Sequence, residues 1–330
     1  MQTLIKASRA YRLLQTEIQA NRHSHAYLVE MDDPRNLRET LKLFAKLFFG
    51  CDKERTEREQ TLARRIDEEQ FSDCLFYPDP DKKFMVDDAE RLMEEATLKP
   101  VEADKKVFVI CDFADANTAS QNKLLKLLEE PPENVVFLLG ATTSYPVLST
   151  VLSRVAKLEI PPFSEREIVS AMQRMYKDKY TQKDMEVCAV ACGGSLGSAQ
   201  TMLEGGDFKI LLDDAFSLCL ATGATLPPIV KKVGETPHKK QLLFLLRLIY
   251  RDATVLKTQN ANSLLLRLEQ DRIQRVADKY LLSSLLHAQS VITQAEKDLA
   301  FSAVYPQLLE ITLSKILLQN AKNIRKTTVK

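Results

Sequence analysis

Two short, continuous runs of apolar residues constrain the fold of this chain most strongly. They are Val107–Cys111 and Val135–Leu139, and charged residues or prolines stand near both. Continuous apolar strands are typical of parallel sheets that are buried on both faces by helices. An amphipathic helical spacing at Leu37–Phe48 supplies one such covering helix. The pattern therefore predicts an α/β domain with a central, mostly parallel sheet.

Several weaker signals complete this expected domain. Residues that favour turns or caps mark its element boundaries. Asp87 is expected to cap a helix that runs through Glu95. Thr118 has capping-box spacing and is expected to open another helix, which ends before Pro131. The further strands that we expect are His25–Val29, Cys74–Tyr77 and Val155–Ile160.

A change of pattern divides the rest of the chain. Pro161 and Pro162 mark a boundary, and the capping box Ser164–Glu167 opens a helix beyond it. Strand patterning is absent after this point, and helical spacing recurs at 184–191, 242–256, 273–292 and 308–318. We therefore predict three domains: an α/β domain at 1–161, a small helical domain at 162–205 and an all-helical domain at 206–330.

The composition suits a cytoplasmic globular protein. Of the 330 residues, 45% are hydrophobic and 28% charged, and no run of eighteen apolar residues predicts a membrane span. The first residues lack the apolar stretch of a secretory signal. The six cysteines are scattered, which is typical of reduced thiols rather than of a disulfide framework.

Charge is distributed unevenly along the chain. Residues 206–330 carry more basic than acidic side chains, whereas 1–205 carry more acidic than basic ones, although the net charge of the whole is only +1. A basic region can attract nucleic acid or an acidic protein surface. A solvated helix surface is the alternative interpretation of an excess that is spread so widely.

The turn after the first expected strand lacks the features of a phosphate-binding loop. Such a loop is glycine-rich, so that its backbone N–H groups surround the phosphates, and a Lys and a Ser or Thr follow. Here residues 30–40 contain no glycine, and Glu39 stands before Thr40 where the lysine is required. Three carboxylates precede the helix, at Glu30, Asp32 and Asp33. Their charges would repel a polyphosphate.

The end of the second apolar strand has only part of a hydrolytic motif. ATPases of this architecture place acidic residues after a buried strand to hold Mg²⁺ and orient water. Asp112 stands in the metal-holding position, but Phe113 replaces the expected general base.

The order of the motifs resembles that of bacterial clamp-loader subunits of the DNA polymerase III holoenzyme. The run Asn122–Pro132 is similar to that family's NALLKxLEEPP segment, and His25–Leu28 is similar to its HAYLF opening. Leu98–Pro100 matches a recurrent LKP, and Ser153-Arg154 matches the first two positions of a Ser-Arg-Cys motif. The resemblance covers residues ~20–205 well and the helical remainder loosely.

This resemblance implies an AAA+-like base domain, a helical lid domain and a helical collar domain that joins the subunits of a hetero-oligomer. The family contains an ATP-hydrolysing motor subunit and a structural stator, delta prime. Where the motor carries a sensor arginine, this chain has Gly197, after Gly194-Ser195-Leu196. Because the ATP-handling features are missing, the resemblance implies that this chain is the stator. The stator is part of the DNA polymerase III holoenzyme (DNA-directed DNA polymerase, EC 2.7.7.7) but is expected to have no ATPase or polymerase activity of its own. The implied partners are the tau/gamma ATPase and delta subunits, with the sliding clamp and primed DNA contacted through the complex.

The same resemblance assigns a role to Arg154. In such assemblies an arginine of one subunit reaches the ATP of its neighbour and neutralises charge on the γ-phosphate, a role that suits the planar, permanently charged guanidinium. Arg154 is implied to be this arginine finger, with Ser153 helping to place it. The alternative is an ordinary surface arginine at the start of a strand.

One departure from the family bears on cofactors. The family usually carries a four-cysteine zinc module between the first helix and the second strand, whereas this segment contains only Cys51 and Cys74. Tetrahedral zinc needs four ligands, so we expect no metal and no other cofactor. Cys188 and Cys192, one helical turn apart, are expected to be buried packing residues. Two other functions stay open: an active AAA+ ATPase with an atypical phosphate loop, and an AAA+-derived scaffold outside replication.

Overall fold

The computed structural model describes residues 1–205, 208–258, 264–266, 269–300 and 304–328. It divides into two compact units, the first formed by residues 1–163 with 195–198 and the second by residues 164–194 with 199–330. The expected division into three domains stays a prediction, since the helices on either side of residue 206 fall within one unit.

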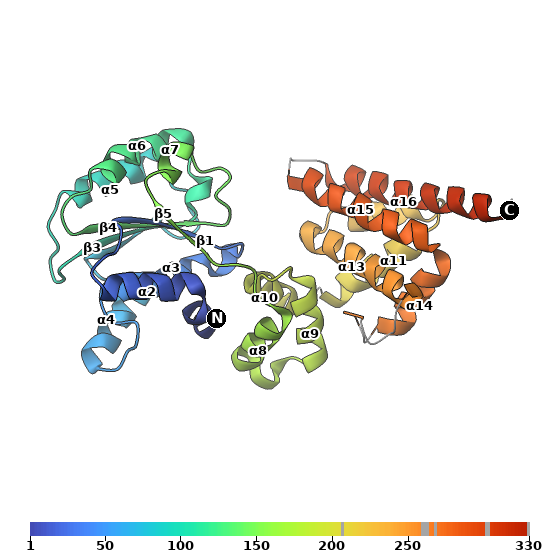
Figure 1. The fold of residues 1–330 in the computed structure, drawn as a ribbon, viewed down its shortest axis with the longest axis horizontal. Helices are drawn as coiled ribbons and strands as arrows, with labels where there is room; N and C mark the ends of the chain where they lie inside the picture. The colour runs from blue at the N-terminus through green and yellow to red at the C-terminus, as the bar shows by residue number, and fades with distance from the viewer. Residues whose placement is uncertain (206–207, 259–263, 267–268, 301–303, 329–330) are drawn as a thin grey trace. The chain divides into compact units, whose positions relative to one another are not determined.

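A five-stranded sheet forms the centre of the first unit (Figure 1). Its order is β2-β3-β4-β1-β5, and every strand pair is parallel, which confirms the expected α/β class. The two apolar runs lie side by side in its interior as β3 and β4, and each residue of these strands is buried. The strands are β1 (Ala26–Glu30), β2 (Cys74–Tyr77), β3 (Lys106–Ile110), β4 (Val135–Ala141) and β5 (Ala156–Glu159).

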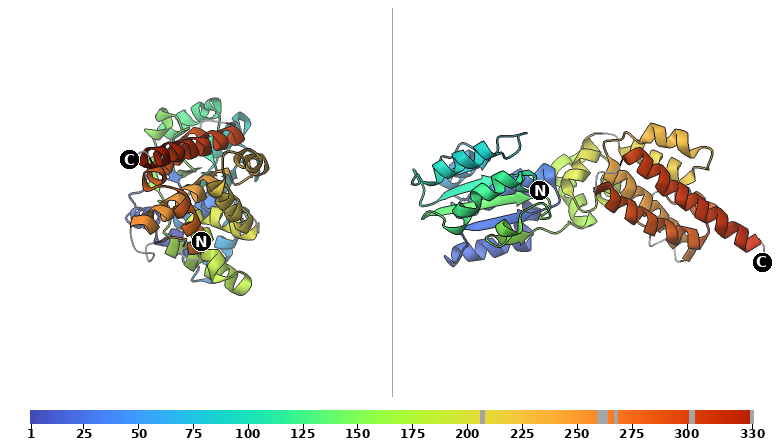
Figure 2. Two further views of the ribbon diagram at one scale, coloured as in Figure 1. Left: turned by 90° about the vertical axis from the view of Figure 1, so that its right-hand side faces the viewer. Right: turned by 90° about the horizontal axis from the view of Figure 1, so that it is seen from above.

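Helices cover both faces of the sheet, as Figures 1 and 2 show. Two apolar clusters result, one on each side, because alternate residues of every strand point to opposite faces. The first face packs against α1 (Gln2–Ala7), α2 (Arg9–Gln19), α3 (Pro34–Phe48) and α4 (Glu57–Asp67), and the second against α5 (Val86–Ala96), α6 (Thr118–Glu129) and α7 (Ser149–Leu152). Of these, α1, α2, α4 and α7 were not predicted.

Two helix caps differ from the sequence-based expectation. The N-cap of α5 is Met85, whose backbone N–H donates to the Asp88 carboxylate, so Asp87 lies inside the first turn. The N-cap of α6 is Asn117, whose side chain accepts from the Ser120 N–H at 2.8 Å. In both helices the N-cap is thus a residue upstream of the expected one. The spacing of residues in the sequence alone does not identify which of them is the N-cap. The expected box at Ser164 and Glu167 is confirmed.

The described residues of the second unit contain helices and no strand. The expected helical region 273–292 is divided, because Tyr280 adopts an extended backbone and ends one helix. The helices are α8 (Glu165–Tyr176), α9 (Gln182–Ala191), α10 (Leu196–Glu204), α11 (Phe208–Leu220), α12 (Leu226–Val233), α13 (Lys239–Thr258), α14 (Gln270–Lys279), α15 (Leu282–Ala300) and α16 (Tyr305–Thr328). The first turn of α10 belongs to the first unit.

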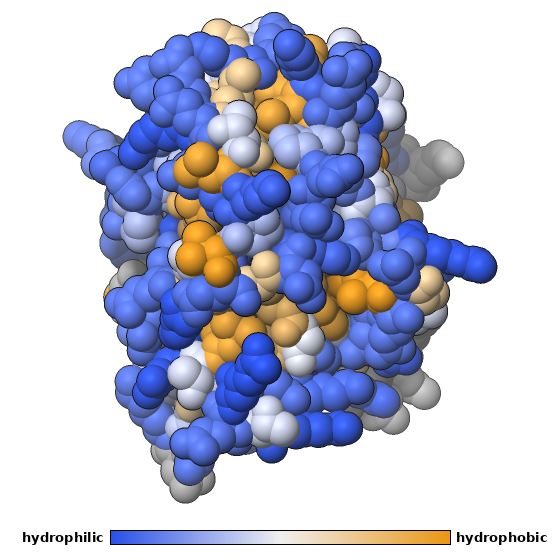
Figure 3. Space-filling model, turned by 90° about the vertical axis from the view of Figure 1, so that its left-hand side faces the viewer, coloured by the Kyte–Doolittle hydropathy of each residue, from blue (hydrophilic) through white to orange (hydrophobic). Residues whose placement is uncertain are grey.

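The surface gives no sign of a membrane span. Among the described residues, no helix combines the length and apolar character needed to cross a bilayer. The face shown in Figure 3 is mostly hydrophilic, and its apolar residues gather in small, separate patches.

Candidate functional site

The carboxyl ends of the parallel strands define the candidate site in the first unit. Strands β1, β3 and β4 are neighbours or next neighbours, and they end at Glu30, Ile110 and Ala141. Ligands of open α/β sheets bind beyond these ends, where the loops that follow the strands meet. The turn after β1, the residues after β3 and the loop after β4 therefore form the region where a nucleotide would bind.

The turn after β1 is closed by the side chain of Asp33. This residue is the N-cap of α3 and is only 2% exposed. Its carboxylate accepts from the Asn36 backbone N–H at 3.2 Å and from the Asn36 side-chain amide at 2.9 Å. A third donor, the backbone N–H of Gly197, lies 2.8 Å from Oδ2. A negative charge thus already occupies the helix N-terminus that would receive phosphate in a phosphate-binding loop.

Glu30, at the end of β1, is also engaged by its own unit. Its carboxylate pairs with the Lys157 ammonium at 2.5 Å and accepts from the Ser144 N–H at 3.1 Å. Burial alone would raise the pKa of Glu30, but these hydrogen bonds outweigh it and lower the pKa below its ordinary value. Glu30 therefore ties β1 to β5 and to the loop after β4 as a carboxylate.

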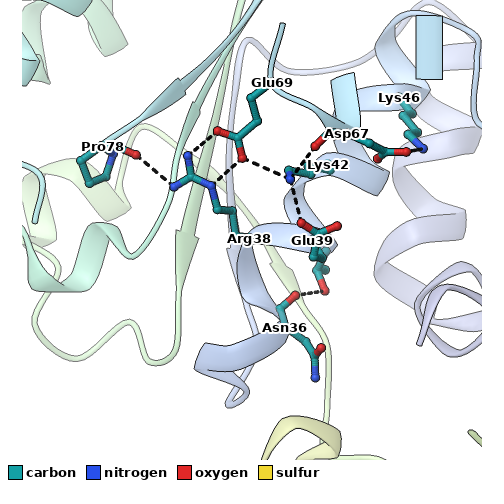
Figure 4. A network of polar contacts seen from close by, with 9 residues as sticks. Asn36, Arg38, Glu39, Lys42, Lys46, Asp67, Glu69 and Pro78 are labelled. Atoms are coloured by element: carbon teal, nitrogen blue, oxygen red, sulfur yellow. Dashed lines mark hydrogen bonds and ion pairs between the residues drawn. The ribbon is translucent and has the colours of Figure 1, made fainter. Parts of the chain in front are cut away.

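A second polar network lies along α3 (Figure 4). The Arg38 guanidinium forms a paired contact with Glu69, at 2.7 and 2.5 Å, and donates to the Pro78 carbonyl at 3.0 Å. Lys42 contacts the same Glu69 at 3.2 Å and Glu39 at 2.7 Å. Burial would raise the pKa of Glu69, yet the Arg38 contact lowers it. Arg38 and Lys42 are thus neutralised within the unit.

The residues after β3 provide no hydrolytic pair. Asp112 has a left-handed backbone, and desolvation followed by the charge of Asp115 raises its pKa. Phe113, in the general-base position, is fully buried and packs against Phe84 with ring centroids 6.3 Å apart. A buried phenyl ring can neither orient water nor accept a proton.

Gly197 leaves no room for a side chain. A Cβ built on this glycine would lie 2.1 Å from Asp33 Oδ1 and 2.7 Å from Arg35 Cβ. A sensor arginine at this position would therefore require the turn after β1 to move. Asp33 in the turn after β1, Phe113 and Gly197 are thus all engaged by packing or by hydrogen bonds of the chain itself.

Arg154 lies just beyond α7, next to Ser153, the C-cap of that helix. Its guanidinium donates to the Thr150 carbonyl at 2.7 Å and to Ser153 Oγ at 3.0 Å, and it forms an ion pair with Glu129 at the end of α6. Ser153 Oγ in turn donates to the Thr150 carbonyl at 3.0 Å. The Arg154 side chain is 32% exposed, and its buried Nε has no hydrogen-bond partner. The strand expected at Val155–Ile160 is present as β5 (Ala156–Glu159), one residue shorter at each end, so Arg154 lies two residues before it.

Arg154 and the closed turn belong to one unit but form separate clusters. Arg154 contacts Thr150, Ser153 and Glu129, whereas Asp33 contacts Asn36 and Gly197. Sequence reasoning missed Glu129 and Arg38 as participants. The signal for Glu129 was present, since it stands in the motif Asn122–Pro132, but its pairing depends on a contact across 25 residues.

The cysteines are packing residues wherever the structure places them. All six are buried, and burial raises the pKa of Cys51, Cys111, Cys188 and Cys219 to about 12. Within the described ranges, no three His, Cys, Asp or Glu side chains gather as a metal-binding group. Cys188 lies within α9, and Cys192 is the C-cap of that helix.

Comparison with known proteins places this arrangement in context. Residues 6–164 match the family model described as "DNA polymerase III, delta subunit". DNA polymerase III subunit tau of Bacillus subtilis (strain 168) is 26% identical over 244 residues, which are 70% of this chain and 42% of that protein. Subunit tau/gamma of Haemophilus influenzae (strain ATCC 51907 / DSM 11121 / KW20 / Rd) is 32% identical over 151 residues, 45% of this chain and 22% of that protein. The chain thus spans less than half the length of these relatives.

Two solved structures are similar over most of their length. A gamma subunit-related protein of Thermotoga maritima has a TM-score of 0.42 at 14% identity, over 93% of this chain and 99% of that one. The DNA clamp loader delta protein of Bacillus subtilis has a TM-score of 0.33 at 11% identity, with the same two coverages.

Proposed function

We propose that the chain is a non-hydrolysing stator of the delta prime type in a clamp loader, on the premise that residues 6–164 match the family model of the DNA polymerase III delta subunit. In this role it supports the loading of the sliding clamp onto primed DNA in the cytoplasm. It assembles with tau/gamma ATPase and delta subunits as one member of a hetero-oligomer. A role in DNA replication is common to the family; the stator role is the finer proposal.

One observation carries this proposal: the nucleotide region is filled by the chain's own groups. Asp33 occupies the α3 N-terminus, Phe113 replaces the general base, and Gly197 leaves no space for a sensor side chain. An ATPase with an atypical loop still needs an anion-accepting backbone cradle and a residue that orients water. These requirements favour the stator over the active ATPase.

Arg154 gives the stator its contribution to catalysis. Donation of an arginine to a neighbour's γ-phosphate accelerates hydrolysis by about 10³–10⁵. Arg154 presents a partly exposed guanidinium whose Nη2 pairs with the Glu129 carboxylate, while its Nη1 donates to Ser153 Oγ and to the Thr150 carbonyl. Glu129 contacts the guanidinium through one carboxylate oxygen, at Nη2, and a phosphate in its place can form the paired contacts that suit a guanidinium.

Residues 206–330, which carry an excess of basic side chains, are proposed to form the collar. Helices α11–α16 include several large apolar side chains that are exposed on this unit, such as Ile311 and Leu318 at 54% and 63% exposure. Residues seven apart on one helix share a face, as these two do on α16. Such a face is available to neighbouring subunits.

The test is affinity capture of the full-length tagged chain from its own cells, with partners identified by mass spectrometry. Co-purification of tau/gamma and delta subunits in fixed ratio is expected. Capture of an unrelated set of proteins, without polymerase subunits, would support the scaffold function outside replication instead.

A further inference from the structure

The Asp33 carboxylate lies at the N-termini of two helices. It caps α3 as N-cap, through the Asn36 N–H. It also accepts the N–H of Gly197, the second residue of α10, a helix that begins 163 residues further along the chain. The first N–H groups of an α-helix have no partner within the helix, and each helix N-terminus carries a partial positive charge.

The burial of Asp33 shows how closely the two helices surround this anion. A carboxylate that is 2% exposed is costly unless charge-assisted hydrogen bonds replace its water. Three N–H donors do so at 2.8, 2.9 and 3.2 Å. Position 197, whose N–H is the donor from α10, accommodates only glycine, because a Cβ there would lie 2.1 Å from Asp33 Oδ1.

We propose that α3 and the first turn of α10 form an oxyanion site that the chain fills with its own carboxylate. Asp33 thereby holds residues 195–198 on the first unit, to which they belong, without any bound nucleotide. In a phosphate-binding loop the corresponding anion would come from the ligand. On this proposal, nucleotide binding is lost because the Asp33 carboxylate replaces the phosphate of a ligand, and not only because the glycines are missing.

The site is expected to accept a small carboxylate once its own is removed. Asp33→Gly leaves the Gly197 N–H, the Asn36 N–H and the Asn36 amide facing a space of the size of a carboxylate. Formate is the matching probe, because it carries the same group and little else. Asp32→Gly is the matched control, since Asp32 is adjacent and exposed and the substitution makes the same change of charge and backbone freedom.

The experiment is hydrogen exchange of backbone amides in the isolated full-length chain, followed by mass spectrometry or by NMR of Gly197. In Asp33→Gly, exchange at residues 196–198 is expected to accelerate about tenfold or more, because one charge-assisted hydrogen bond is lost. Added formate should restore protection in this variant, whereas chloride at the same ionic strength should not. Wild type and Asp32→Gly should respond to neither salt.

Two further variants distinguish the loss of this hydrogen bond from a general loss of folding. Asp33→Asn retains the shape of the cap and should accelerate exchange at residue 197 less than Asp33→Gly. Gly197→Ala should accelerate exchange of the Asn36 amide, since the added methyl group displaces Asp33. Unchanged protection of Gly197 in Asp33→Gly would overturn the proposal. So would a loss of protection that formate does not restore while circular dichroism shows a folded chain. These measurements need no partner subunit, so their outcome is independent of the stator function and of Arg154.

Discussion

The turn after β1 and the corner at Arg154 use charge in opposite ways. Asp33 is buried, and each of its contacts comes from backbone or side-chain groups of its own unit. Arg154 is partly exposed and is paired with a carboxylate that is itself 47% exposed. A buried, satisfied charge is costly to rearrange, whereas an exposed pair is worth little and exchanges readily. The Asp33 region is therefore fixed structure, while the Arg154 guanidinium is partly exposed, as the proposed contact with a neighbouring subunit requires.

The largest expected effect comes from Arg154→Ala in the reconstituted clamp loader. Hydrolysis at the ATP site that faces this subunit should slow by about 10³-fold or more, because the trans arginine is lost. Other sites should leave residual steady-state ATPase activity. Arg154→Lys should recover only part of the rate, since a point charge lacks the paired donors. Arg91→Ala, which removes another exposed arginine of the same unit, is the matched control and should be neutral.

Assembly is the second readout for Arg154→Ala. Gel filtration should show an intact complex, because substitutions of exposed side chains usually change stability by less than about 0.5 kcal/mol. An intact complex with unchanged ATPase and loading rates would contradict the finger and leave Arg154 as an ordinary surface residue.

The next effect concerns stability at the network along α3. Arg38→Met should lower the free energy of unfolding by about 1–3 kcal/mol, because the partly buried Glu69 loses its paired donor and retains only Lys42. Urea denaturation of the isolated chain measures this. ATPase activity of the assembled complex should not change. A stability loss that is no larger than that of Arg154→Ala would remove the contrast between the two regions.

Much of this contrast was predictable from sequence, and part of it was not. The apolar runs of β3 and β4 predicted the buried parallel sheet, because burial on both faces leaves no polar position. The missing glycines and Phe113 are the sequence features from which we propose that ATP handling is lost. The role of Asp33 was not predicted, although Asp before Pro34 is a frequent N-cap signal, because its third donor comes from Gly197. Contacts across such separations are not encoded in local patterns.

A smaller effect concerns pH. The folded pKa of Glu30 is lowered, so its carboxylate contributes stability above the ordinary pKa of about 4.5, and this contribution is lost as pH falls through the folded value. Glu30→Gln should therefore be less stable than wild type at pH 7, and the difference should shrink below about pH 4.5. Chemical denaturation at a series of pH values measures it. A difference that stays constant down to pH 3 would show that Lys157 does not favour the charged form.

The smallest effect is expected from Glu129→Gln, which releases the Arg154 guanidinium. An exposed ion pair contributes about 0.2–1 kcal/mol, so the ATPase kcat of the complex should rise by no more than about fivefold. The double variant with Arg154→Ala should behave as Arg154→Ala alone. A fall in kcat for Glu129→Gln would mean that Glu129 positions the guanidinium instead of competing for it.

The central claim is that this chain has closed its own nucleotide region, and titration calorimetry of the purified chain with ATP and Mg²⁺ tests it most directly. Millimolar nucleotide should give no binding heat above dilution, because Asp33 already occupies the α3 N-terminus and the loop offers no lysine or glycine cradle. Binding in the micromolar range would contradict the account and favour an ATPase with an atypical phosphate loop.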